Sequence, residues 1–210
     1  MTDPKRLVDQ CVHKGLLYLA ESLQYYWPAN RYGKTPLLNE VAENNIALHL
    51  ARSFAAKGFL MWAEVPFEGV NKRLDFFAYH DKDKLGVALE LKTSIDKPPS
   101  GSRDDLERLI KIANSNLANA DAVNVEGAKW LYGIVSVLYA SALVDWWQNP
   151  EGCDDYLPKG YRAASYKQIG MALTKAYTHK VVPLRDWGDS CTHAAYALYD
   201  ENSINVLKMC

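Results

Sequence analysis

Two apolar segments separated by four polar residues constrain the fold of this chain most strongly. The segments are residues 73–80 (RLDFFAYH) and 85–93 (LGVALELKT), and residues 81–84 between them read Asp-Lys-Asp-Lys. Apolar runs of this length joined by a short polar linker are typical of a β-hairpin. If the hairpin closes symmetrically about the linker, paired residue numbers sum to 165, and Asp75 faces Glu90.

This pairing places two carboxylates side by side. Directly opposed residues have Cβ atoms roughly 4.5–5.5 Å apart, and like charges there destabilise the pair. Because side chains alternate along a strand, Lys92 shares the face of Asp75 and Glu90. The other face is apolar and is expected to lie in the core: Leu74, Phe76, Ala78, Val87, Leu89 and Leu91. We therefore expect a cation between the carboxylates, and a divalent metal is the candidate that also supports chemistry.

A surface charge ladder is the alternative explanation of the same residues. In it Asp75 pairs diagonally with Lys92, and Glu90 pairs with Arg73, as exposed salt bridges that contribute little each. The aromatic residues Phe77 and Tyr79 on that face favour a partly covered site over a solvated surface.

A helix is predicted upstream of the hairpin, from Pro36 to Lys57, with Thr35 as its N-cap. Glu43 falls inside the apolar arc of this helix, where a carboxylate is costly unless it is paired or bound to a metal. It is expected either to join Asp75 and Glu90 at the metal, or to pair with a lysine or cap a loop amide.

Three carboxylates of this kind suit a hard cation, Mg²⁺ or Mn²⁺. Such an ion lowers the pKa of bound water and neutralises charge that accumulates on phosphoryl oxygens. Lys92 would orient or help deprotonate the water, or hold a phosphate as a point charge. The sequence contains no glycine-rich GxxxxGK phosphate loop that would compete with this interpretation.

At these residues the chain resembles the PD-(D/E)XK nuclease superfamily, which has the restriction-endonuclease-like fold. The resemblance rests on Arg73-Leu74-Asp75 in one strand, Glu90-Leu91-Lys92 in the next and Glu43 in the helix before them, and it covers roughly residues 36–140. It implies an α/β fold with an αβββαβ core on a mixed central sheet flanked by helices. It also implies that Asp75 and Glu90 bind Mg²⁺, that Lys92 is catalytic and that Glu43 assists at the metal, with the Leu91 carbonyl as a possible further ligand.

Two positions depart from that pattern. Leu74 stands where the family motif has proline, and Glu43 lies fifteen residues before Gly58, about one helical turn farther than expected.

The remaining elements fit one domain spanning residues 1–210. We predict an N-terminal helical extension over residues 1–34, a core over about 36–140 and C-terminal α/β additions over 141–210. Helices are expected over residues 5–26, from Ser102 onward and over 165–180. Strands are expected over 59–67, 73–80, 85–93, 130–140 and 194–199, whereas residues 146–164 read mostly as loop.

Composition limits where a nucleic acid can bind. The chain has 24 Lys and Arg residues against 25 Asp and Glu residues, so its formal charge is −1. A phosphate site must therefore be local, and tight binding is expected to need a homodimer or a protein partner. Arg73, Lys97 and Arg103 are the candidate contacts; Lys97, Arg103, Arg108 and Lys111 either line a phosphate-binding rim or form a solvated helix face.

The sequence has no CxxC pair, no signal-type apolar segment and no run of transmembrane length. We expect a cytoplasmic chain without membrane contact. The predicted function is that of a Mg²⁺- or Mn²⁺-dependent nuclease acting on DNA, with RNA left open as a substrate class. The alternative is a catalytically silent module of the same fold that binds protein or nucleic acid.

Overall fold

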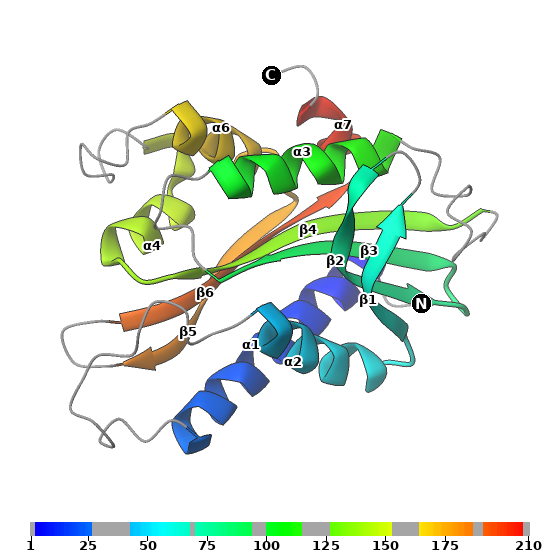
Figure 1. The fold of residues 1–210 in the computed structure, drawn as a ribbon, viewed down its shortest axis with the longest axis horizontal. Helices are drawn as coiled ribbons and strands as arrows, with labels where there is room; N and C mark the ends of the chain where they lie inside the picture. The colour runs from blue at the N-terminus through cyan, green and yellow to red at the C-terminus, as the bar shows by residue number, and fades with distance from the viewer. Residues whose placement is uncertain are drawn as a thin grey trace.

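The chain forms a mixed six-stranded sheet with helices on both faces (Figure 1), as seen in a computed structural model that describes residues 3–26, 43–67, 70–93, 100–114, 127–152, 164–186 and 191–207. The strand order is β1-β2-β3-β4-β6-β5. The expected α/β class with a mixed central sheet is therefore confirmed. The elements are α1 (Pro4–Tyr26), α2 (Glu43–Ala55), β1 (Leu60–Phe67), β2 (Val70–His80), β3 (Leu85–Lys92), α3 (Ser100–Asn114), β4 (Lys129–Leu138), α4 (Ser141–Gln148), the 3-10 turn η2 (Pro150–Gly152), α6 (Ala164–Leu173), β5 (Thr178–Asp186), β6 (Cys191–Asp200) and α7 (Glu201–Val206).

The hairpin between β2 and β3 has the predicted register. Pairs run from His80↔Leu85 to Phe76↔Leu89, and the two residue numbers in each pair sum to 165. In the connecting turn Lys84 adopts a positive φ of 49°. The described pairing ends at Phe76↔Leu89, so Asp75 lies just beyond the last paired residue of β2.

Strand β3 lies inside the sheet, where the antiparallel and the parallel part of the sheet meet. It pairs antiparallel with β2 and parallel with β4. A parallel connection requires a crossover, and α3 lies on that crossover between β3 and β4. This arrangement places α3 over one face of β3, the face on which Glu90 and Lys92 lie.

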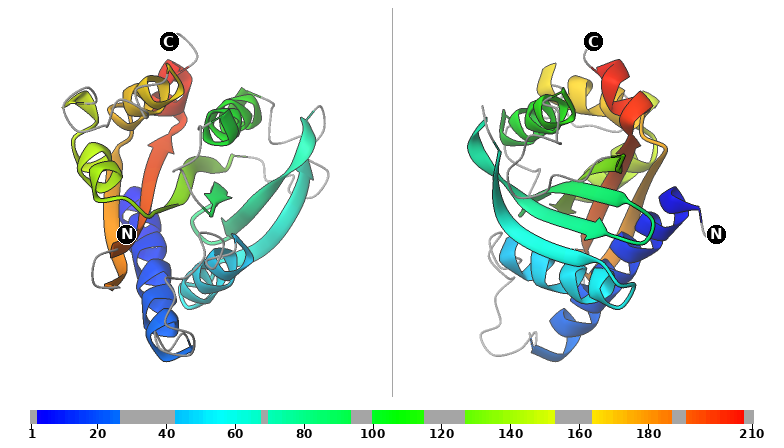
Figure 2. Two further views of the ribbon diagram at one scale, coloured as in Figure 1. Left: turned by 60° about the vertical axis from the view of Figure 1, so that its left-hand side comes forward. Right: turned by 90° about the vertical axis from the view of Figure 1, so that its right-hand side faces the viewer.

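Two apolar layers enclose the sheet (Figure 2). One packs β2, β3 and β4 against α1 and α2, and contains Phe76, Val87 and Leu89. The other packs the opposite face against α3, α4 and α6, and contains Phe77 and Ala88. The hairpin faces are therefore as predicted, except that Leu74 belongs to the second layer. Leu74 packs there with its β1 partner Val65, in the ribbon of β1 and β2 that curves toward α3 (Figure 2).

The C-terminal part differs from the prediction in three places. The helix expected over residues 165–180 ends at Leu173, and residues 178–186 form the edge strand β5, in which Thr178, Val181 and Val182 are β-branched. Strand β6 is longer than expected and begins at Cys191. The segment around Trp146 is helix α4, whose Trp146 and Trp147 are fully buried.

The predicted helix over residues 36–57 is described from Glu43, and residues 36–42 lie outside the described part of the chain. Among the helices that the structure describes, none combines the length and the apolar character that crossing a bilayer requires.

Helices α1 and α2 cross closely at Gly15. A Cβ atom at this position would lie 2.9 Å from Leu50 Cδ2 and 3.0 Å from Leu50 Cα. Alanine at a helical position is more stable than glycine by about 1 kcal/mol. At position 15, however, Leu50 of α2 occupies the space that the methyl group of alanine would need.

We predict that Gly15→Ala destabilises the chain by about 1–3 kcal/mol, because overpacking outweighs helix propensity. Urea unfolding measures the change, and Glu21→Ala, at an exposed position of α1, is the matched control. Equal or greater stability of Gly15→Ala would show that the crossing has room to spare.

Candidate functional site

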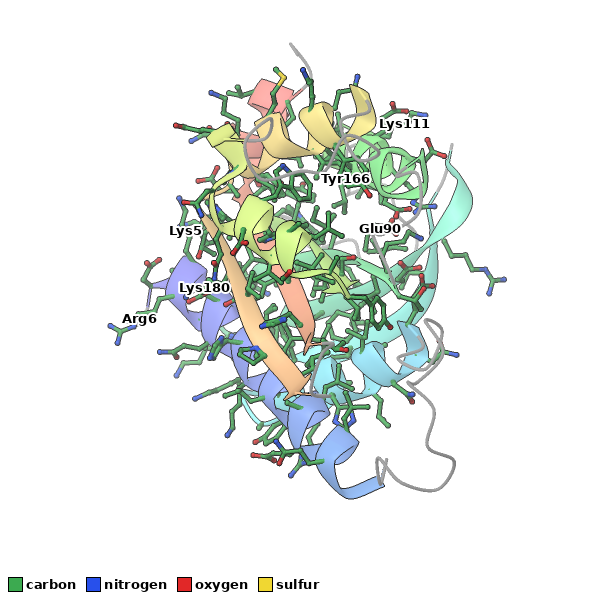
Figure 3. All side chains as sticks on the ribbon, turned by 90° about the vertical axis from the view of Figure 1, so that its left-hand side faces the viewer. Lys5, Arg6, Glu90, Lys111, Tyr166 and Lys180 are labelled. Atoms are coloured by element: carbon green, nitrogen blue, oxygen red, sulfur yellow. The ribbon has the colours of Figure 1, made fainter. Side chains whose placement is uncertain are left out.

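Glu90 is a carboxylate in the interior of the molecule. Its side chain is 0% exposed, and it lies on β3 beneath α3 (Figure 3). Every described neighbour from Leu85 to Leu91 on this strand is also buried. An ionised group at such a position requires a charged or hydrogen-bonding partner.

That partner is Arg108 of α3. Its Nε donates to Glu90 Oε1 at 2.7 Å, and its Nη2 donates to Glu90 Oε2 at 3.0 Å. Both carboxylate oxygens are therefore engaged by one guanidinium, the bidentate geometry that gives the strongest charge-assisted pairs. Nη2 of Arg108 also donates to Asp105 Oδ1, one turn earlier on α3. Asp105 is itself only 3% exposed.

Lys92 connects this interior cluster to the surface. Its Nζ lies 3.1 Å from Asp105 Oδ2 and 3.6 Å from Glu43 Oε1 at the start of α2. Burial lowers the pKa of Lys92, but the carboxylates of Asp105 and Glu43 outweigh burial and the net pKa is raised. Lys92 is therefore an ammonium at neutral pH, a hydrogen-bond donor and a point charge.

Asp75 joins the cluster from β2. Its Oδ2 accepts a hydrogen bond of 2.7 Å from the backbone N–H of Leu91. The carboxylate thus satisfies an amide of β3 at the place where the backbone pairing of β2 has ended. Its negative charge acts on the pKa of Glu90, Asp105, Lys92 and Arg108, so it lies within electrostatic reach of the whole cluster.

We call Asp75, Glu90 and Asp105 the acidic cluster. Burial, the charge of Asp75 and a hydrogen bond with Asp75 raise the pKa of Glu90 to about 9, against a lowering effect of Arg108. Burial also raises the pKa of Asp105, which Lys92 and Arg108 only partly offset. Three carboxylates face two cations, and Glu43 adds a fourth acid at the rim. The cluster therefore has fewer cations than carboxyl groups, and the raised pKa of Glu90 means that a proton offsets the difference when no further cation is present.

The chemistry of the acidic cluster fits a hard divalent cation, since its donors are all carboxylate oxygens. Oδ2 of Asp105 is buried and has no hydrogen-bond partner of good geometry, although Lys92 lies nearby. As the side chains stand, however, no three His, Cys, Asp or Glu residues within the described part of the chain are placed to hold a metal. Arg108 and Lys92 occupy the oxygens that a metal would need.

The structure brings together most of the residues that the sequence singled out. Asp75, Glu90 and Lys92 meet on the α3 side of the sheet, and Glu43 contacts Lys92 from α2. With 39% of its side chain exposed, Glu43 lies at the rim and not within the buried arc of its helix. Its contact is the lysine pair that had been the alternative to a metal role.

Of the basic residues proposed for nucleic acid, the structure describes the side chain of Arg73 alone. Arg73 is exposed, and the side chain of Arg103 and all of Lys97 lie outside the described part of the structure. The exposed charge ladder is wrong, because Glu90 is fully buried and pairs with Arg108 instead of Arg73. Arg108 belongs to neither a phosphate-binding rim nor a solvated helix face.

Sequence reasoning missed the roles of Asp105 and Arg108. Both lie on the buried stripe of α3 with Leu109 and Ile112, at spacings of three, four and seven residues from Asp105. A stripe that includes Leu109 and Ile112 also includes Asp105 and Arg108, and it would have predicted that these two residues face the sheet. The sequence pattern predicts an apolar stripe of Leu106, Leu109, Ile110, Ala113 and Leu117 for this helix. Leu106 and Leu109 are buried, Ile110 and Ala113 are only partly buried, and Leu117 lies outside the described residues.

We predict that Glu90 makes stability fall as pH rises. Its pKa is about 9 in the folded chain against an ordinary 4.5, so the folded chain keeps a proton that the unfolded chain releases between these values. The free energy of unfolding therefore declines across this window. In Glu90→Gln this contribution is absent, so wild type should lose stability relative to the variant from about pH 5 to about pH 9.

Urea unfolding at several pH values measures this difference, with Glu21→Gln at an exposed position of α1 as control. Parallel stability profiles for wild type and Glu90→Gln would contradict the raised pKa.

Comparison with protein-family models, with curated proteins and with solved structures finds no match to this chain. The site must therefore be interpreted from its own geometry.

Proposed function

We propose that this chain is a Mg²⁺-dependent nuclease that hydrolyses phosphodiester bonds of DNA. The observation that supports it best is the acidic cluster itself, a buried group of carboxylates with too little positive charge and an ammonium beside it. A divalent cation supplies the missing charge. Mg²⁺ and Mn²⁺ prefer oxygen ligands of this kind.

The arrangement of elements supports the same proposal. The order α2, three antiparallel strands, α3 and a parallel strand β4 is the αβββαβ order that the resemblance to PD-(D/E)XK nucleases implies. The residues of that motif lie at corresponding places: Asp75 near the end of the β2–β3 pairing, and Glu90 and Lys92 in β3.

In the proposed reaction, water attacks phosphorus and loses a proton to solvent, the bond from phosphorus to the leaving sugar oxygen breaks, and that oxygen takes up a proton from solvent. When bound, Mg²⁺ supplies charge neutralisation and a lowered pKa for water. Asp75 and Glu90 would hold it, with Asp105 as a further carboxylate on the same face. Lys92, which the acids keep protonated, orients the water or contacts a phosphate oxygen by donating a hydrogen bond.

DNA is the proposed substrate, and RNA offers the same phosphodiester chemistry. The formal charge of −1 gives no general attraction to a polyanion, so a second subunit or another protein would contribute to binding. Arg73, exposed on β2 beside the site, is the described candidate for a phosphate contact.

A second candidate is a catalytically silent module of the same architecture. The observation that favours it is the bidentate pair of Arg108 with Glu90, which engages both oxygens of a proposed metal ligand. In that case the cluster is a structural ion-pair network, and metal addition would change neither stability nor activity.

The two candidates differ in their response to Mg²⁺. For the nuclease we expect Mg²⁺-dependent cleavage of plasmid or oligonucleotide DNA that falls about 10²–10³-fold in Lys92→Ala, since a donor to developing charge is lost. Asp75→Asn should reduce it at least as much, because a carboxylate ligand is removed. Gel analysis of the products over time gives the rates.

The controls are Lys84→Ala and Asp81→Asn, which break an exposed pair of 3.0 Å in the hairpin turn and should leave cleavage unchanged. Circular dichroism establishes that each variant is folded. A folded wild type without Mg²⁺-dependent cleavage of DNA or RNA, or cleavage indifferent to Lys92 and Asp75, would refute the nuclease.

A further inference from the structure

We propose that Arg108 is a built-in counter-cation that competes with the divalent metal for Glu90, so that loading the metal requires Arg108 to release the carboxylate. This inference rests on the proposed metal-dependent function and concerns a residue outside the family-like motif. Arg108 would thereby set the metal affinity of the site as a positioning residue.

The first support is the completeness of the pair. Nε and Nη2 of Arg108 donate to the two different oxygens of Glu90 at 2.7 and 3.0 Å. Glu90 is fully buried, so water cannot take over either hydrogen bond without entering the interior. A metal that binds Glu90 must therefore replace at least one of the two bonds.

The second support is charge. The guanidinium also contacts Asp105, so its single positive charge faces two members of the acidic cluster at once. A divalent cation among the same carboxylates would repel the guanidinium at short range in a medium of low effective dielectric. The two cations therefore do not share Glu90 in its present geometry.

The third support concerns what is able to move. Helix α3 is anchored by Leu109 and Ile112, both 0% exposed and packed in the apolar layer beneath it. The side chain of Arg108 is long and about one tenth exposed, so it lies at the edge of that layer. Release is then a rotamer change of Arg108 that leaves the helix in place.

Mn²⁺ binding by the whole chain tests the competition without reference to activity. Isothermal titration calorimetry with Mn²⁺ compares wild type, Arg108→Gln and Arg108→Lys at one pH. We expect Arg108→Gln to bind Mn²⁺ at least about tenfold more tightly than wild type, a change of about 1.4 kcal/mol. Arg108→Lys should be intermediate, because an ammonium is a point charge and does not form the bidentate fork.

Lys111→Gln is the matched control. Lys111 is an exposed cation on the outer side of the same helix (Figure 3), so its loss should change Mn²⁺ affinity little. Asp75→Asn in the Arg108→Gln background should abolish the gain, which locates the ion at the acidic cluster. If Arg108→Gln does not fold, Arg108→Lys alone decides, with tighter Mn²⁺ binding as the supporting result.

Equal or weaker Mn²⁺ binding by the folded Arg108 variants overturns the inference, whatever the cleavage assay shows. Absence of Mn²⁺ binding in wild type and in every variant overturns it as well. Tighter Mn²⁺ binding without cleavage by any variant supports the inference and contradicts the nuclease alone, so the two proposals fail on different measurements.

Discussion

The site depends on one constraint, a carboxylate placed on a strand that is buried from end to end. Strand β3 is covered by helices on both faces and flanked by β2 and β4, so Glu90 has no route to solvent. The Glu90 carboxylate therefore needs a cationic partner from a neighbouring helix or strand. Because β3 and β4 are parallel, the chain between them crosses the face of the sheet on which Glu90 lies. Helix α3 is part of this crossover and provides Arg108.

From that constraint the rest of the cluster follows. Asp105 lies one turn from Arg108, and its carboxylate holds the guanidinium from the other side. Lys92 contacts both Asp105 and Glu43. The network of ion pairs therefore begins at the fully buried Glu90 and ends at the half-exposed Glu43. The network links α2, β3 and α3, which are otherwise in different layers of the molecule. Charge pairing thus joins the two sides of the sheet at the C-terminal end of β3.

The hairpin could be predicted from sequence because two local signals agreed. The alternation of apolar residues fixed the faces, and the four-residue linker fixed the register from His80↔Leu85 to Phe76↔Leu89, before any tertiary contact was considered. The predicted pairing of Asp75 with Glu90 lies beyond this register, where Asp75 accepts a hydrogen bond from the backbone of Leu91. Leu74 was misplaced because curling of the β1–β2 ribbon is a tertiary property that alternation does not encode. Residues 178–180 were misassigned to a helix, and the strand over residues 178–186 was missed, because its formation is decided by pairing with β6.

Arg108 was missed for a related reason. An aspartate and an arginine three residues apart on a helix usually form a solvated pair. Only the geometry of packing shows that this pair lies between the helix and the sheet. Asp75, Glu90 and Lys92 on the hairpin were thus accessible from the sequence, whereas Asp105 and Arg108 on α3 were not.

The bidentate pair has a consequence for how the chain can change over evolutionary time. Removing one partner of a buried ion pair leaves the other charge stranded, whereas replacing both by apolar residues of similar volume is often tolerated. Positions 90 and 108 are therefore expected to covary among related chains: a lineage that lost the acid would also lose the arginine, and an acid retained with the arginine exchanged would mark a lineage in which another cation holds the carboxylate.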